Sequence, residues 1–173
     1  MIPQQKTDQT AQKQYQPGDL VLFSNSGLFD KLVKFFTSCE YSHAGVILEL
    51  KEKYVVVGEA WGNGFDIRKR KYSELEKCRV RRPKEALLNI RENMLKYVGR
   101  PYDKLNIFGL VLFRFLGIKL FKTSANAMTC SEFSARFFYD ASKKINFEKE
   151  FQKPYDYITP ADLSKSKQLI DLV

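Results

Sequence analysis

The residue types that could carry chemistry in this chain are a cysteine, the single histidine and a carboxylate. Cys130 stands in the stretch Thr-Cys-Ser-Glu-Phe at 129–133, where Thr129 is a typical helix N-cap residue. A cysteine at a helix N-terminus lies beside unpaired backbone N–H groups and the positive end of the helix dipole, and both favour the thiolate. The stretch therefore predicts a reactive thiol rather than one buried only for packing.

A thiol hydrolase or transferase also needs an imidazole that holds and returns the proton, and a polar residue that orients the imidazole. His43 begins an apolar segment of strand type, and the small residues Ala44 and Gly45 after it leave room for another element to approach. A sole histidine is also compatible with a structural role, in which one ring nitrogen bonds to a backbone carbonyl. The expected hairpin partner of this strand carries Glu59, so Cys130, His43 and Glu59 together predict a catalytic set.

The other two cysteines do not fit a metal site or a disulfide framework. Cys39, Cys78 and Cys130 are an odd number of thiols, and none of them forms a metal-binding pair at short spacing. Cys39 lies just before His43 in a setting typical of packing, and Cys78 lies among basic residues without a nearby base. We expect free thiols in a reducing compartment, and no metal or organic cofactor.

The elements that must position these residues follow from the apolar periodicity and the turn signals. Alternating or β-branched runs predict strands, and apolar residues at helical spacing predict helices. The predicted helices flank a block of antiparallel strands, which is typical of the α+β class. The expected strands are 20–23, 41–50, 53–61, 65–72 and 78–83, and the expected helices are 27–38, 84–99 and 130–143, with a further helix start at 159–162.

The length of 173 residues fits one domain with a real hydrophobic core. We expect this domain to occupy 17–173, after a polar lead at 1–16 that need not be ordered. The lead lacks the apolar run of a secretion signal, so we expect a cytoplasmic protein, with a peripheral membrane location as a variant.

The formal charge of +9 is densest at 68–84, where arginine and lysine dominate. This segment matches no base-reading module, so we expect no sequence-specific nucleic acid partner. Two interpretations of the charge remain open: a solvated basic face, or contact with an acidic surface such as an anionic membrane.

The most apolar segment, 105–121, contains Arg114 and Lys119 and is short for a bilayer-spanning helix. A buried core helix and an exposed flap that covers a groove or dips into a lipid surface remain as alternatives. Together, the apolar segment 105–121 and the basic segment 68–84 predict peripheral contact with an anionic membrane as one option.

Six short motifs occur in one order along nearly the whole chain, from about 17 to 163. They are GDLVLF at 18–23, YSHAGVIL at 41–48, GEAW at 58–61, VGRPYD at 98–103, TCSEF at 129–133 and ITPADL at 158–163. This ordered set resembles the circularly permuted branch of the NlpC/P60 papain-like superfamily, and within it the YiiX/YaeF-like group. The lecithin–retinol acyltransferase-like proteins are more distant relatives.

The resemblance implies a permuted papain-like fold, in which the histidine strand precedes the nucleophile helix. It also implies Cys130 as nucleophile, His43 as general base and then acid, and Glu59 as the residue that orients His43. The backbone N–H of Cys130 is the natural first oxyanion donor, and no second donor can be identified from the sequence.

Four further residues are candidates for binding the substrate. Tyr41 directly precedes the histidine strand, and Trp61 follows Glu59 closely. Tyr102 and Asp103 resemble family positions close to the groove. Each of the four is also compatible with a structural role.

Three functions remain open at this stage. The first is a cysteine hydrolase that cleaves an amide bond through an acyl-enzyme, with cell-wall-like peptides as the substrate class that the superfamily implies. The second is a lipid acyl hydrolase or acyltransferase at a membrane surface. The third is a lipid- or peptide-binding module without chemistry. The sequence leaves the oligomeric state open.

Overall fold

The computed structural model describes residues 15–103 and 126–172. Two predicted segments lie outside the described residues: residues 1–14 of the polar lead, and the apolar segment 105–121. The strands are β1 Leu20–Phe23, β2 His43–Leu50, β3 Val55–Trp61, β4 Gly64–Arg70, β5 Arg79–Pro83 and β6 Leu169–Asp171. The helices are α2 Leu28–Thr37, α3 Tyr72–Leu75, α4 Ile90–Leu95, α6 Cys130–Ser142, α7 Phe147–Phe151 and α8 Pro160–Lys165, with a short 3-10 helix at Tyr155–Tyr157.

These strands form one six-stranded sheet in the order β4-β3-β2-β1-β5-β6, and every neighbouring pair is antiparallel. The predicted hairpin is confirmed, because β2 pairs with β3 across a charged turn. The β-branched run Val55–Val57 suits this central position, where the strand is covered on both faces. An antiparallel sheet with helices packed around it confirms the α+β class.

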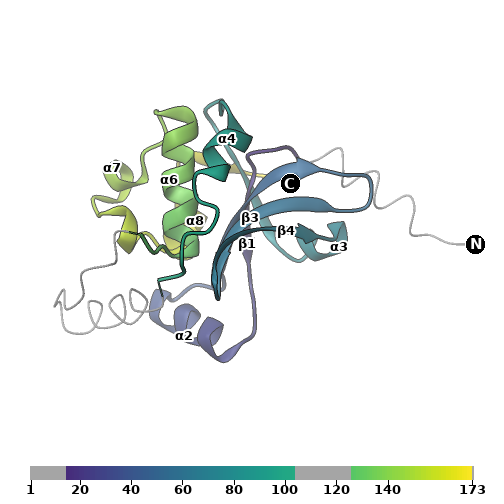
Figure 1. Cartoon of the computed structure of the whole chain (residues 1–173). Coiled ribbons are helices and arrows are strands. Elements are labelled where there is room, and N and C mark those ends of the chain that lie inside the picture. Colours follow the sequence, from purple (N-terminus) through teal and green to yellow (C-terminus); the bar gives the residue numbers. More distant parts are fainter. Residues whose placement is uncertain (1–14, 104–125, 173) are drawn as a thin grey trace, which may run out of the picture.

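The sheet separates two apolar clusters, and the alternation along β1 shows the division. Leu20 and Leu22 belong to the larger cluster, and Val21 and Phe23 belong to the smaller one. Helix α6 packs on the larger cluster against β2 and β3, whereas α3 supplies side chains to the smaller one. Figure 1 shows α6, α7 and α8 gathered beside the sheet, with α2 set apart at one end of the molecule.

The predicted helix at 84–99 is wrong in its extent, because the structure forms only α4, Ile90–Leu95, within it. The backbone N–H groups of Lys84 and Leu88 donate to carbonyl groups of other elements, at 3.0 and 2.9 Å, instead of building a helical ladder. Asn89 then takes a left-handed conformation with φ of 51°, and the helix begins only after it. The tertiary partners of this segment therefore override its helical periodicity.

Four arginines of the predicted basic segment are held by carboxylates within the fold. These ion pairs join β4 to β3 and α3, and β5 to β6 and to the residue before β1, so the density of basic residues in the sequence overstates the basic surface here. They join Arg70 to Glu59 and Glu74, Arg79 and Arg81 to Asp171, and Arg82 to Asp19. Within 15–103 and 126–172, no helix is both long and apolar enough to cross a membrane.

Candidate active site

Cys130 is the first residue of α6, as its sequence setting predicts. Thr129 is the N-cap: its backbone is extended, and its Oγ1 accepts a hydrogen bond from the Glu132 N–H at 3.2 Å. The Ser131 hydroxyl does not cap the helix but donates to the Ile158 carbonyl at 2.6 Å. This bond fixes the start of α6 against the segment that leads into α8.

His43 is the first residue of β2, and Glu59 lies on the neighbouring strand, where it pairs with Gly45. A Cβ atom on Gly45 would come within 2.8 Å of Val57 Cγ1 and 3.3 Å of Glu59 Cβ, so only glycine leaves Glu59 its place. The Glu59 carboxylate lies 2.6 Å from His43 Nε2, and both side chains are buried. The hairpin register therefore brings together the histidine and the carboxylate that the sequence predicted.

The other ring nitrogen of His43, Nδ1, is buried and has no hydrogen-bond partner among the described protein atoms. The His43 ring and the Cys130 thiol are close enough to interact as charges, and each shifts the pKa of the other. Since Nε2 is occupied by Glu59, Nδ1 is the ring atom left to exchange a proton with the Cys130 sulfur.

The electrostatics of this buried group favour a thiolate and an imidazolium. Burial alone raises the pKa of Cys130, but the neighbouring His43 and the N–H groups of Ala44 and Ser131 outweigh burial and lower that pKa below its ordinary value. Burial also lowers the pKa of His43, but Cys130 and Glu59 outweigh burial and raise it from 6.5 to about 9. A charged pair in a site with little water interacts strongly, because the local dielectric is low.

Arg70 is a member of the site that the sequence did not reveal. Its Nε donates to Glu59 Oε1 at 3.0 Å and its Nη2 donates to Glu59 Oε2 at 2.9 Å, and a further bond at 3.3 Å reaches Glu74. Burial raises the pKa of Glu59, but bonding to His43 and Arg70 outweighs burial and lowers it. Arg70 thus keeps the orienting carboxylate ionised and fixed in direction.

A hydrogen bond that the sequence did not predict joins α2 to the residue before the histidine strand. The Ser42 hydroxyl donates to the Asp30 carboxylate at 2.7 Å, and both side chains are buried. Since Ser42 directly precedes His43, this bond fixes the end of the strand that carries the imidazole. A serine before a histidine carries no signal for a partner on another helix, which explains why the sequence did not reveal it.

Aromatic rings enclose the imidazole on two sides. The Trp61 ring meets the His43 ring edge to face, with ring centres 4.8 Å apart. The Phe23 ring lies 5.4 Å from the His43 ring, and the Arg70 guanidinium lies over that same Phe23 ring. Trp61 therefore lies at the candidate site, where it limits the rotation of the imidazole and excludes water from it.

The Tyr102 side chain lies near Cys130. The segment before it is held against β4, because Gly64, with φ of 138°, lets the Arg100 carbonyl approach and accept from the Phe65 N–H at 2.8 Å. Tyr102 then forms a parallel bridge with Met128, just before α6 begins. Burial, and then the nearby Cys130 sulfur, raise the Tyr102 pKa well above 10, so its hydroxyl keeps its proton and can donate.

The remaining two candidates lie farther from the thiol. Asp103 is buried, and its backbone N–H donates to the Met128 carbonyl at 3.1 Å, so it helps to hold the bridge beside Tyr102. Tyr41 is half-buried, and its pKa is raised by burial and the neighbouring Glu40 and lowered by Arg79, with no contribution from the residues around Cys130.

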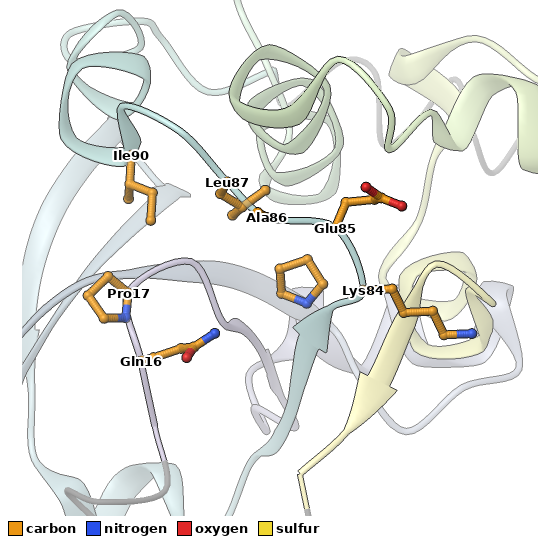
Figure 2. A pocket seen from close by; sticks show the side chains of 8 residues that line it. Gln16, Pro17, Lys84, Glu85, Ala86, Leu87 and Ile90 are labelled. Carbon is orange, nitrogen blue, oxygen red and sulfur yellow. The ribbon is translucent and has the colours of Figure 1, made fainter.

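One depression of about 540 Å³ lies away from this group. It is lined by Gln16 and Pro17 before β1 and by the segment Pro83–Leu87 with Ile90 (Figure 2). None of the proposed catalytic side chains lines it, so the depression provides no substrate site for the thiol. In the part of the chain that the structure describes, no three His, Cys, Asp or Glu side chains are placed to hold a metal ion.

Neither a family model nor a curated protein matches this chain. Among solved structures, the chain is similar to the crystal structure of the metalloprotein YiiX from Escherichia coli O157:H7, described as DUF1105. The two share 19% sequence identity with a TM-score of 0.62, over 92% of this chain and 97% of that one. This likeness confirms the predicted YiiX-like fold.

Proposed function

We propose that this protein is a cysteine hydrolase that cleaves an amide bond through a thiol acyl-enzyme on Cys130. The observation that carries the proposal is the series of buried Cys130, His43 and Glu59 with half-buried Arg70, in which each group is bonded to or interacts with the next. A binding protein has no use for a thiol whose pKa is lowered by an oriented imidazolium. The permuted papain-like topology is part of this proposal.

In the acylation step, the Cys130 thiolate attacks the carbonyl carbon of the amide and a C–S bond forms. The carbonyl oxygen becomes an oxyanion. The imidazolium of His43 then donates its Nδ1 proton to the amine nitrogen, and the C–N bond breaks. The products are a thioester on Cys130, a free amine and a neutral imidazole, while Glu59 keeps the ring oriented through Nε2.

In the deacylation step, His43 Nδ1 takes a proton from a water molecule, and the resulting hydroxide attacks the thioester carbonyl. The C–S bond breaks, the acid leaves, and the thiolate and imidazolium are restored. An acceptor other than water would give acyl transfer by the same steps. Glu59 stays ionised throughout, because Arg70 and His43 both hold its pKa low.

The oxyanion needs donors near the sulfur. The N-terminus of α6 presents the backbone N–H of Cys130 and the positive end of the helix dipole. The Tyr102 hydroxyl, which reaches the same sulfur, is the second donor that the sequence could not identify. We assign Tyr102 this role, because its raised pKa keeps the proton on the oxygen.

YiiX is described as a metalloprotein, and the donor set of this chain does not fit such a site. The single histidine is engaged at Nε2 by Glu59, and the guanidinium of Arg70 bonds to both oxygens of that carboxylate. No cluster of three suitable side chains is found in 15–103 and 126–172. No step of the proposed reaction therefore passes through a metal.

Intact-mass spectrometry tests the proposal. Wild type and Cys130→Ala are incubated with peptide amides, including isopeptide and D-amino-acid linkages, and with acyl lipids. We expect an acyl adduct from a peptide amide on wild type, none on Cys130→Ala, and an unchanged adduct on the control Cys78→Ala. Turnover by Cys130→Ala would overturn the mechanism, and adducts from acyl lipids alone would overturn the amide substrate class.

A further inference from the structure

Helix α2 exposes an apolar face. Leu28 and Phe35 are 82% and 73% exposed, and Leu32 between them is also exposed. These three residues are spaced i, i+4 and i+7, so they form one stripe along the helix. An exposed apolar stripe on a helix is costly in water and marks a surface that contacts something else.

The charges beside this stripe are positive. Lys31 is exposed and lies three residues after Leu28 and four before Phe35, at the edge of the stripe, whereas Lys34 is half-buried and its Nζ donates to Ser24 Oγ at 2.8 Å. The acidic residue of the helix, Asp30, is buried and bonded to Ser42. The outward surface of α2 therefore combines apolar side chains with the cation of Lys31 and presents no carboxylate of its own.

We propose that α2 docks this protein on an anionic phospholipid surface. The helix is far too short to span a bilayer, and an apolar stripe with an exposed lysine at its edge is typical of a helix that lies in the plane of the lipid headgroups. Lysines near such a surface attract anionic lipids, and leucine and phenylalanine side chains enter the boundary with the acyl chains.

The positive charge favours a lipid surface over a second copy of the chain. A two-fold interface buries the same patch of both subunits, so it would bring both copies of Lys31 into one contact to which α2 contributes no exposed carboxylate. Like charges in an interface are unfavourable, whereas anionic headgroups complement them. The net charge of +9 adds to this attraction at long range.

Docking through α2 also places the candidate site next to the lipid. The Asp30–Ser42 bond joins the inner face of α2 to the residue directly before His43. The docking surface does not depend on the thiol chemistry proposed above, since none of its residues belongs to that group. Cys130→Ala should therefore bind lipid as wild type does, which separates failure of the two proposals.

Vesicle sedimentation tests the docking surface. The probes are phosphatidylcholine vesicles with and without phosphatidylglycerol, at low and high salt. We expect binding to the anionic vesicles at low salt, which weakens at high salt. The double variant Leu28→Ser, Phe35→Ser should lose affinity about tenfold or more, because two apolar side chains no longer enter the lipid.

The matched control is Leu88→Ser, which removes an apolar side chain that is 68% exposed outside α2. It should bind as wild type does, and all variants should keep the wild-type melting temperature, because exposed substitutions change stability little. Three results would overturn the proposal: no binding of wild type to anionic vesicles at low salt, equal binding by the double variant, or a wild-type dimer that the double variant dissociates.

Discussion

His43 Nε2 lies 2.6 Å from the Glu59 carboxylate, both side chains are buried, and the rings of Trp61 and Phe23 pack against the imidazole. This contact fixes which nitrogen of the imidazole remains for the thiol, and it supplies a negative charge that holds a proton on the ring. The consequences for activity can each be tested by a single substitution.

Glu59→Gln should move the pH profile of activity. The Glu59 carboxylate helps to raise the pKa of His43 to about 9, and activity needs the imidazolium, so activity falls as pH rises through this value. Glutamine removes the negative charge and lowers the His43 pKa, so the alkaline limb of kcat/KM should shift to lower pH. We expect the maximal rate to fall about tenfold or more. An alkaline limb that stays in place would contradict the role of Glu59.

Arg70→Met should destabilise the protein and slow the reaction. The substitution leaves the buried Glu59 carboxylate without its bidentate partner, which costs about 2–3 kcal/mol of the free energy of unfolding. Arg70→Lys keeps the charge but loses the paired bonds, so it should fall between wild type and Arg70→Met. Denaturant unfolding and kcat/KM measure both effects.

The control for Arg70 is Lys69→Met on the same strand, since Lys69 is exposed and lies over the Tyr54 ring. This change should alter the free energy of unfolding by no more than about 0.5 kcal/mol. An Arg70→Met protein that matches Lys69→Met in both stability and rate would show that Arg70 does not position Glu59.

Substituting the two threonine N-cap residues one at a time distinguishes an effect on helix stability from an effect on the reactivity of the thiol. Thr129 caps α6 at Cys130, and Thr159 caps α8 by the same kind of bond to Asp162. Thr129→Ala and Thr159→Ala should each lose about 1 kcal/mol of stability. Only Thr129→Ala should also raise the pKa of Cys130, because its helix start loosens around the sulfur.

Thermal unfolding and the pH dependence of thiol alkylation measure the two effects. Equal changes in thiol pKa for both threonine variants would show that the N-terminus of α6 does not act on Cys130 in particular.

Tyr102→Phe should lower kcat with little change in stability, because it removes a hydroxyl that donates at the sulfur and keeps the ring. Loss of one oxyanion donor costs about 100- to 1000-fold in kcat in well-studied hydrolases. The control Tyr41→Phe removes a hydroxyl that faces Glu40 and Arg79 instead, and it should keep its rate. A normal kcat for Tyr102→Phe would remove this residue from the oxyanion site.

The elements that build the site could be predicted because their signals are local. The N-cap at Thr129 and the apolar spacing after it predicted the start of α6, and the β-branched hairpin placed Glu59 beside the histidine strand. These signals depend on neighbours along the chain. The structure confirms both elements and brings Cys130, His43 and Glu59 together.

What the sequence missed depends on contacts between distant segments. In the sequence, Arg70 is one of four consecutive basic residues. Only the folded sheet shows that it bonds to Glu59. Asp30 reads as a surface residue of an amphipathic helix, but it is buried against Ser42. The helix expected at 84–99 failed for the same reason, since carbonyl groups elsewhere in the fold take its backbone N–H groups.

The most direct measurement is the ultraviolet absorbance of the thiolate, recorded as wild type minus Cys130→Ala from acid to alkaline pH. It needs no substrate and no access for a reagent. We predict that one thiolate appears below pH 9.0, the ordinary pKa of the thiol, and that His43→Asn shifts its appearance upward. A Cys130 thiolate that appears only at or above pH 9.0, as expected for Cys78 with its pKa raised to about 11, would contradict the proposed mechanism.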